Sequence, residues 1–148
     1  MALNRHDAAV QRSIESIQFN HIKEKLQIPD LRSNPKLALP DNPNCIIIPD
    51  FYSESSSIIG EIYSHLGKLK PAQLHKIAAD ILKMLLWEKV IEIPMKKYIT
   101  VCSEQVYKQL KGISNLAETI RRFNVELLYL PLSPEMEEQL RIAMKRQK

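Results

Sequence analysis

The stretch from residue 46 to residue 83, IIIPDFYSESSSIIGEIYSHLGKLKPAQLHKIAADILK, decides the fold. Two runs rich in β-branched residues, at 45–52 and 57–65, are separated by the polar sequence Ser-Glu-Ser-Ser, which predicts a hairpin of two strands. A helix is predicted at 71–90, because Pro71 suits a first turn and apolar residues recur along one face. A hairpin followed by a long helix indicates a sheet that is covered by helices.

The rest of the chain continues this alternation of strands and helices. In chain order we predict helix 5–26, capped by Asn4 or Asp7, a proline-rich loop at 27–44 with a candidate short strand at 36–39, strands 45–52 and 57–65, helix 71–90, strand 96–102, helix 103–123 bent at Gly112, strand 125–132 and helix 133–148. The order α-β-β-β-α-β-α-β-α predicts a single α/β domain over residues 1–148, with a mixed central sheet flanked by helices.

Composition sets the class of protein. The chain has 148 residues, 45% of them hydrophobic and 26% charged, and a net charge of +4, which suits a globular protein and is compatible with a polyanionic partner. Cys45 and Cys102 lie in apolar runs without the spacing of zinc ligands, so we expect buried thiols of a reducing compartment. The first residues carry no apolar signal segment, and no apolar run reaches the roughly 18 residues of a membrane span. These features predict a cytoplasmic protein that does not bind membranes.

Two acidic residues dominate the chemistry of the predicted hairpin. Asp50 and Glu61 are almost equidistant from the turn near Ser55-Ser56, and residues equidistant from a turn lie opposite each other. Pro49 cannot donate to a ladder of hydrogen bonds, so regular pairing should break beside Asp50. Two facing carboxylates are suitable ligands for one hard divalent cation. The alternative is an ordinary solvated acid pair.

Lysines follow these acids closely. Lys68 and Lys70 come shortly after Glu61, and the helix at 71–90 presents Gln73, Lys76, Asp80 and Lys83 on one face. Cations beside a metal site hold a phosphate or activate a water molecule. We therefore take Lys68, Lys70, Gln73 and Lys76 as candidate catalytic residues, against the alternative of a solvated helix face. His65 shares the strand face of Glu61 and Tyr63, which gives it either a site role or a packing role.

The segments IIIPD, GEIYSHLGKLK and QLHKIAADILK resemble the PD-(D/E)xK nuclease superfamily, which has the restriction-endonuclease-like fold. They also resemble bacterial proteins with a GEI-(Y/F)-(A/S)-H-x-GKLK signature. The resemblance implies that Asp50 and Glu61 bind Mg²⁺ or Mn²⁺, that Glu15 is a further metal-binding acid, and that a lysine orients the attacking water. It also implies a nucleic-acid substrate, DNA in preference to RNA.

One position departs from the superfamily pattern. Tyr63 stands where the motif has its lysine, and tyrosine does not supply a cation. Either the lysine has migrated to Lys68, Lys70 or Lys76, or the chain binds nucleic acid without cutting it. A third hypothesis is an assembly protein that forms a homodimer through its last helix. The apolar residues of that helix are Met136, Leu140, Ile142 and Met144.

Overall fold

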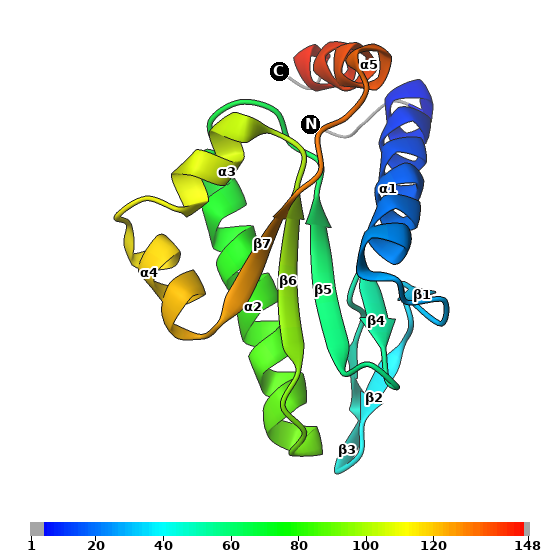
Figure 1. Cartoon of the computed structure of the whole chain (residues 1–148), viewed down its shortest axis with the longest axis vertical. Helices are drawn as coiled ribbons and strands as arrows, with labels where there is room; N and C mark the ends of the chain where they lie inside the picture. Colours follow the sequence, from blue (N-terminus) through cyan, green and yellow to red (C-terminus); the bar gives the residue numbers. More distant parts are fainter. Residues whose placement is uncertain (1–4, 147–148) are drawn as a thin grey trace.

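A computed structural model describes residues 5–146 and contains a five-stranded mixed sheet with helices on both faces (Figure 1). Its elements are α1 (Arg5–Leu26), β1 (Arg32–Ser33), β2 (Leu37–Leu39), β3 (Asn42–Ile47), β4 (Phe51–Ser53), β5 (Ile58–Tyr63), α2 (Pro71–Ile91), β6 (Lys96–Val101), α3 (Glu104–Leu110), α4 (Asn115–Arg122), β7 (Val125–Tyr129) and α5 (Pro134–Lys145). The α/β class and the mixed sheet are as predicted.

The sheet has the strand order β1-β4-β5-β6-β7, and β2 and β3 form a separate two-stranded ribbon. β4 is antiparallel to β1 and to β5, whereas β5, β6 and β7 are parallel. α2 is the crossover that joins the parallel neighbours β5 and β6. β6 pairs with β5 from Ile58 to Tyr63, but β4 pairs only with Ile58–Gly60. The side of β5 that faces β4 is therefore open from Glu61 onward.

Two apolar layers sandwich the sheet, because neighbouring strand residues point to opposite faces. Ile58 packs with Ile22 of α1 on one face, and Ile59 packs with Ile77 of α2 on the other. In Figure 1, α1 (blue) and α2 (green) accordingly lie on opposite sides of β5, and α5 (red) crosses the end of the sheet. α5 is anchored there by Leu140, in a cluster that includes Ile14 of α1.

Gly60 is required at its place in β5. It pairs with Phe51 of β4, and a Cβ atom at position 60 would lie 2.0 Å from the Phe51 ring. The absence of a side chain lets the tip of this aromatic ring lie against the strand. The pair adjoins Asp50 and Glu61, so it fixes the hairpin beside the two acids.

Three predicted segments were wrong in detail. The strand expected at 45–52 is interrupted: β3 ends at Ile47, β4 begins at Phe51, and Pro49 lies in the break. The helix expected at 103–123 is two helices, because the chain turns after Leu110 and Ser114 starts α4 by accepting a hydrogen bond from the Ala117 amide at 3.1 Å. The expected loop at 27–44 also contains β1 and the start of β3 beside the anticipated short strand.

The remaining helices follow the sequence pattern. α1 spans the predicted residues, α2 extends to Ile91, and α5 begins at Pro134 with Ser133 as its cap. The candidate cap Asn4 and positions 147 and 148 lie outside the described residues. Within residues 5–146, no helix is both long enough and apolar enough to cross a membrane.

Candidate active site

The two acids of the hairpin meet at the break between β3 and β4. The Asp50 backbone N–H donates to Glu61 Oε2 at 3.3 Å, and the Ile62 N–H donates to Asp50 Oδ2 at 2.7 Å. The Asp50 carbonyl accepts a bond from the Asn34 N–H at 3.1 Å. The Asp50 carboxylate therefore takes the place of a backbone hydrogen-bond partner of β5. Hydrogen bonds at its own N–H and carbonyl hold the Asp50 backbone in place. The two acids lie together as the hairpin symmetry predicted.

Lys83 of α2 completes this group. Its ammonium contacts Glu61 Oε1 as an ion pair. The same ammonium lies 3.4 Å from Asp80 Oδ1 and donates to the Ile48 carbonyl at 3.2 Å. Sequence reasoning placed Lys83 on the correct helix face but did not select it. It lies about two turns beyond Lys76, on the same face of the helix.

Glu61 has an unusual environment for a carboxyl group. Glu61 is only 2% exposed to solvent. Burial raises the pKa of Glu61 to about 9, and the charge and hydrogen bond of Asp50 add to this effect against the opposing bond from Lys83. Burial alone would lower the pKa of Lys83, but the bond and charge of Glu61, together with Asp80, outweigh it and raise that pKa. Glu61 is thus held in its protonated form beside a protonated lysine.

Glu15 faces the same region from α1. Its side chain is open to solvent but lies in a concave part of the surface, next to Asp50. Loss of water in this hollow raises the pKa of Glu15, and the charge of Asp50 raises it further against the charge of Arg12. Within residues 5–146, no three histidine, cysteine or acidic side chains are grouped closely enough to hold a metal ion. The ligand set that the structure brings together is therefore the pair Asp50 and Glu61.

The three lysines selected from the sequence lie elsewhere. Lys68 and Lys70 are exposed near the start of α2, and Lys76, whose side chain is 66% exposed, pairs with Asp80 at 3.2 Å. Among the described ion pairs, Lys83 is the lysine that contacts either hairpin acid. Lys83, which the sequence reasoning did not select, is thus the lysine that lies beside the two acids.

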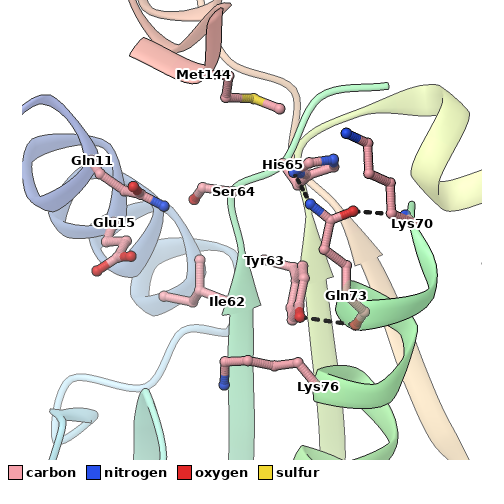
Figure 2. A pocket seen from close by; sticks show the side chains of 10 residues that line it. All are labelled: Gln11, Glu15, Ile62, Tyr63, Ser64, His65, Lys70, Gln73, Lys76 and Met144. Atoms are coloured by element: carbon pink, nitrogen blue, oxygen red, sulfur yellow. Dashed lines mark hydrogen bonds between the residues drawn. The ribbon is translucent and has the colours of Figure 1, made fainter. Parts of the chain in front are cut away.

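A cavity of about 400 Å³ runs along the open side of β5. Figure 2 shows Gln11 and Glu15 of α1 on one side and residues of α2 on the other, with Met144 of α5 above them. Its lining also includes Ile62, Tyr63, Ser64, His65, Lys70, Gln73 and Lys76. The predicted site-facing residues Gln73 and Lys76 do line this cavity, as do Lys70 and His65.

Comparisons with protein-family models, with curated proteins and with solved structures found no match. The functional argument therefore depends on the residues and their geometry.

Proposed function

We propose that this chain is a metal-dependent nuclease of the PD-(D/E)xK type, built on a restriction-endonuclease-like core, that hydrolyses phosphodiester bonds in nucleic acid, DNA in preference to RNA. The observation that carries the proposal is the meeting of Asp50, Glu61 and Lys83 where β5 loses its β4 partner. The antiparallel β4–β5 hairpin and the α2 crossover to a parallel strand also support it. In this proposal Lys83 is the migrated lysine.

The residues present fit a Mg²⁺ or Mn²⁺ ion. Magnesium in proteins is bound by one or two carboxylates, and water and substrate phosphates complete its octahedron. Asp50 and Glu61 supply such a pair, and Glu15 lines a hollow together with Asp50. Burial, and then the charge of Asp50, raise the pKa of Glu61, and a bound divalent cation would favour its ionised form. When bound, the ion supplies a Lewis acid that polarises the phosphate.

Each residue of the chain has a role that follows from its contacts. Asp50 is oriented by its bond from the Ile62 N–H, so its carboxylate has a fixed direction. Lys83 stays protonated because Glu61 and Asp80 raise its pKa, so it acts as a donor and a charge rather than as a base. A donor at this point orients the water that attacks phosphorus in line and stabilises the negative charge that develops on the phosphate oxygens.

Tyr63 does not replace the lysine. Its hydroxyl donates to the Gln73 carbonyl at 3.0 Å, and burial, with the nearby acids Asp80, Glu61 and Asp50, raises its pKa. The phenol therefore stays neutral and joins β5 to α2 as a structural link. In this proposal Lys83, which approaches Glu61 from α2, takes the role that the motif gives to a lysine at position 63.

The test is a cleavage assay with Mg²⁺ or Mn²⁺ on single-stranded, duplex and branched DNA and on RNA. We expect Lys83→Met to lower the rate by about 100-fold or more, since loss of one preorganised donor costs that much in other enzymes. Lys89→Met is the matched control, because Lys89 is an exposed lysine in the last turn of α2. An Asp50→Ala, Glu61→Ala double variant identifies a contaminating nuclease. If the unmutated protein cleaves none of these substrates, the proposal fails.

A second function is favoured by one observation. Lys83 contacts Glu61 directly and so occupies one oxygen of the candidate metal pair, as in a site that only binds nucleic acid. This alternative predicts affinity that falls with salt and no turnover. Calorimetry with Mn²⁺ separates the two functions, because the nuclease requires metal binding that depends on Asp50 and the binding module does not.

A further inference from the structure

We propose that Tyr129 is a stacking platform for a base of a single-stranded nucleic acid, beside the cavity of the candidate active site. Its ring packs against the ring of Tyr107 in α3, with the ring centroids 5.5 Å apart and the planes inclined by 24°. The position of this platform next to a phosphate that is cut rests on the proposed nuclease function. The stacking itself can be measured without metal and without cleavage.

The Tyr129 ring is held at the edge of the sheet. β7 is an edge strand, and Leu127 of this strand packs against the core cluster on the α2 side. Because strand side chains alternate, Tyr129 shares the face of Leu127 and meets α3 there. The ammonium of Lys111 lies 4.7 Å from the centre of the Tyr107 ring, as in a cation–π contact. Tyr129 is nevertheless 37% exposed, so a ring whose orientation is already fixed remains open to a ligand.

Tyr129 also lines a hollow of about 430 Å³, separate from the hollow beside Asp50. We call it the Tyr129 hollow, and its size is that of clefts that bind small molecules. Leu66 and Pro131 contribute apolar surface to it. The two acids that line it are each paired with a cation on their own helix, in the pairs Glu104–Lys108 and Glu137–Arg141, both at 2.9 Å. An aromatic ring beside apolar walls, with the acids neutralised, suits the flat face of a base.

The platform and the candidate active site lie at the same end of the sheet. Tyr63 of β5 pairs with Val101 of β6, which pairs with Tyr129 of β7, so two strand spacings, or about 10 Å, separate the tyrosines. α5 gives the same separation, because Glu137 lines the Tyr129 hollow and Met144 lines the cavity, about two turns or 10 Å further along the helix. In Figure 1 the arrowheads of β5, β6 and β7 all point to the end that α5 crosses. Ligands of parallel sheets bind at this end.

The segment between the two concave regions has the charge that a phosphate backbone requires. His65 lines the cavity, and the next residue, Leu66, lines the Tyr129 hollow. Residues 64–70, SHLGKLK, contain Lys68 and Lys70 and no acid, so a strand that crosses this segment meets positive charge. Proteins that bind single strands combine such charge with aromatic rings on which bases stack. The bases of a duplex already stack on one another, so the platform favours a single-stranded substrate.

Binding in EDTA tests the platform, and affinity is measured by fluorescence anisotropy. One probe is a short fluorescein-labelled oligothymidylate, and the other is the same backbone with abasic residues in place of the thymidines. Tyr129→Leu should weaken binding of the oligothymidylate about tenfold, the usual value of one base stacked on an aromatic ring. It should leave binding of the abasic probe unchanged, because it removes a ring and no charge. Tyr129→Phe keeps the ring and should bind both probes within about twofold of the unmutated protein.

Phe123→Leu is the matched control, because Phe123 is a half-exposed aromatic residue just before the other end of β7. Unchanged melting temperatures check that each variant is folded. Equal affinity of the Tyr129→Leu and Phe123→Leu variants for the oligothymidylate would overturn the platform, even if Asp50-dependent cleavage is found. An equal loss for both probes in Tyr129→Leu would also overturn it, because the loss would not depend on a base. Tyr129-dependent binding without any cleavage would keep the platform and reject the nuclease.

Discussion

Replacing Glu61 by glutamine should make the protein more stable at neutral pH, although it removes a central residue of the candidate site. Glu61 is 2% exposed, and its pKa in the folded chain is about 9, against an ordinary value of 4.5. The folded chain therefore binds a proton on Glu61 between these two pH values that the unfolded chain does not. Stability falls as pH rises through this window, because the folded state holds more protons.

The size of the effect follows from the same two pKa values. Each pH unit above 4.5 costs about 1.4 kcal/mol until the folded pKa is reached, so the cost is about 3 kcal/mol at pH 7. Glutamine has the shape of the protonated acid, carries no charge at any pH and keeps a donor for Asp50. We therefore expect Glu61→Gln to raise the free energy of unfolding by about 3 kcal/mol at pH 7 and by less than about 1 kcal/mol at pH 5.

Urea unfolding of both proteins at pH 5, 6, 7 and 8 measures this difference without metal. Glu104→Gln is the control, because Glu104 is an exposed acid whose side chain is 65% accessible and pairs with Lys108 on its own helix. Its effect should be small and nearly independent of pH. A Glu61→Gln difference that stays constant from pH 5 to pH 8 would refute the reasoning, because it would mean that Lys83 keeps Glu61 ionised in the folded chain.

Three further outcomes follow from single contacts. Binding of Mn²⁺ at pH 7 should release about one proton per site, because the ion would displace the proton of Glu61. Calorimetry in two buffers of different ionisation enthalpy measures this release, and Glu61→Gln should abolish it. Gly60→Ala should cost about 2 kcal/mol or more in urea unfolding, because its Cβ would overlap the Phe51 ring, and a neutral effect would mean that the ring moves freely. Trp87→Phe should cost about 1 kcal/mol, because the indole N–H donates to the Tyr52 hydroxyl at 3.2 Å in the core, and unchanged stability would show that this bond contributes nothing.

The pairing of Asp50 with Glu61 was predictable because it depends on local geometry. A short connection fixes which residues of a hairpin face each other, and the register Phe51–Gly60 extends directly to the two acids. The effect of Pro49 was predictable for the same reason, since a missing N–H acts on its own strand. Burial of Glu61 was not predictable from its neighbours in sequence. It arises because α2, ten residues further on, packs over this face of β5.

The identity of the lysine depends on tertiary structure. Tyr63 bonds to Gln73 near the start of α2, and from there the helix runs back along the sheet toward the level of Glu61. Side chains of a helix lean toward its N-terminus, so a lysine reaches groups that lie before its own Cα. Lys83 leans back to Glu61 in this way, whereas Lys76 is held by Asp80. The sequence shows which residues of α2 share a face. Which of them lies beside Glu61 depends on how the helix packs against the sheet.

The break at Pro49 links the stability of the hairpin to its chemistry. An interrupted strand leaves backbone groups of its neighbours without partners, which is costly unless side chains replace them. Here the Asp50 carboxylate accepts the Ile62 N–H, the Lys83 ammonium satisfies the Ile48 carbonyl, and proline itself has no N–H to satisfy. The two side chains that close the break are also those that the proposed reaction requires, one a carboxylate and one a cation. Substituting either one should therefore reduce stability and activity together, whereas Glu61→Gln should separate them, raising stability while it abolishes metal-dependent cleavage.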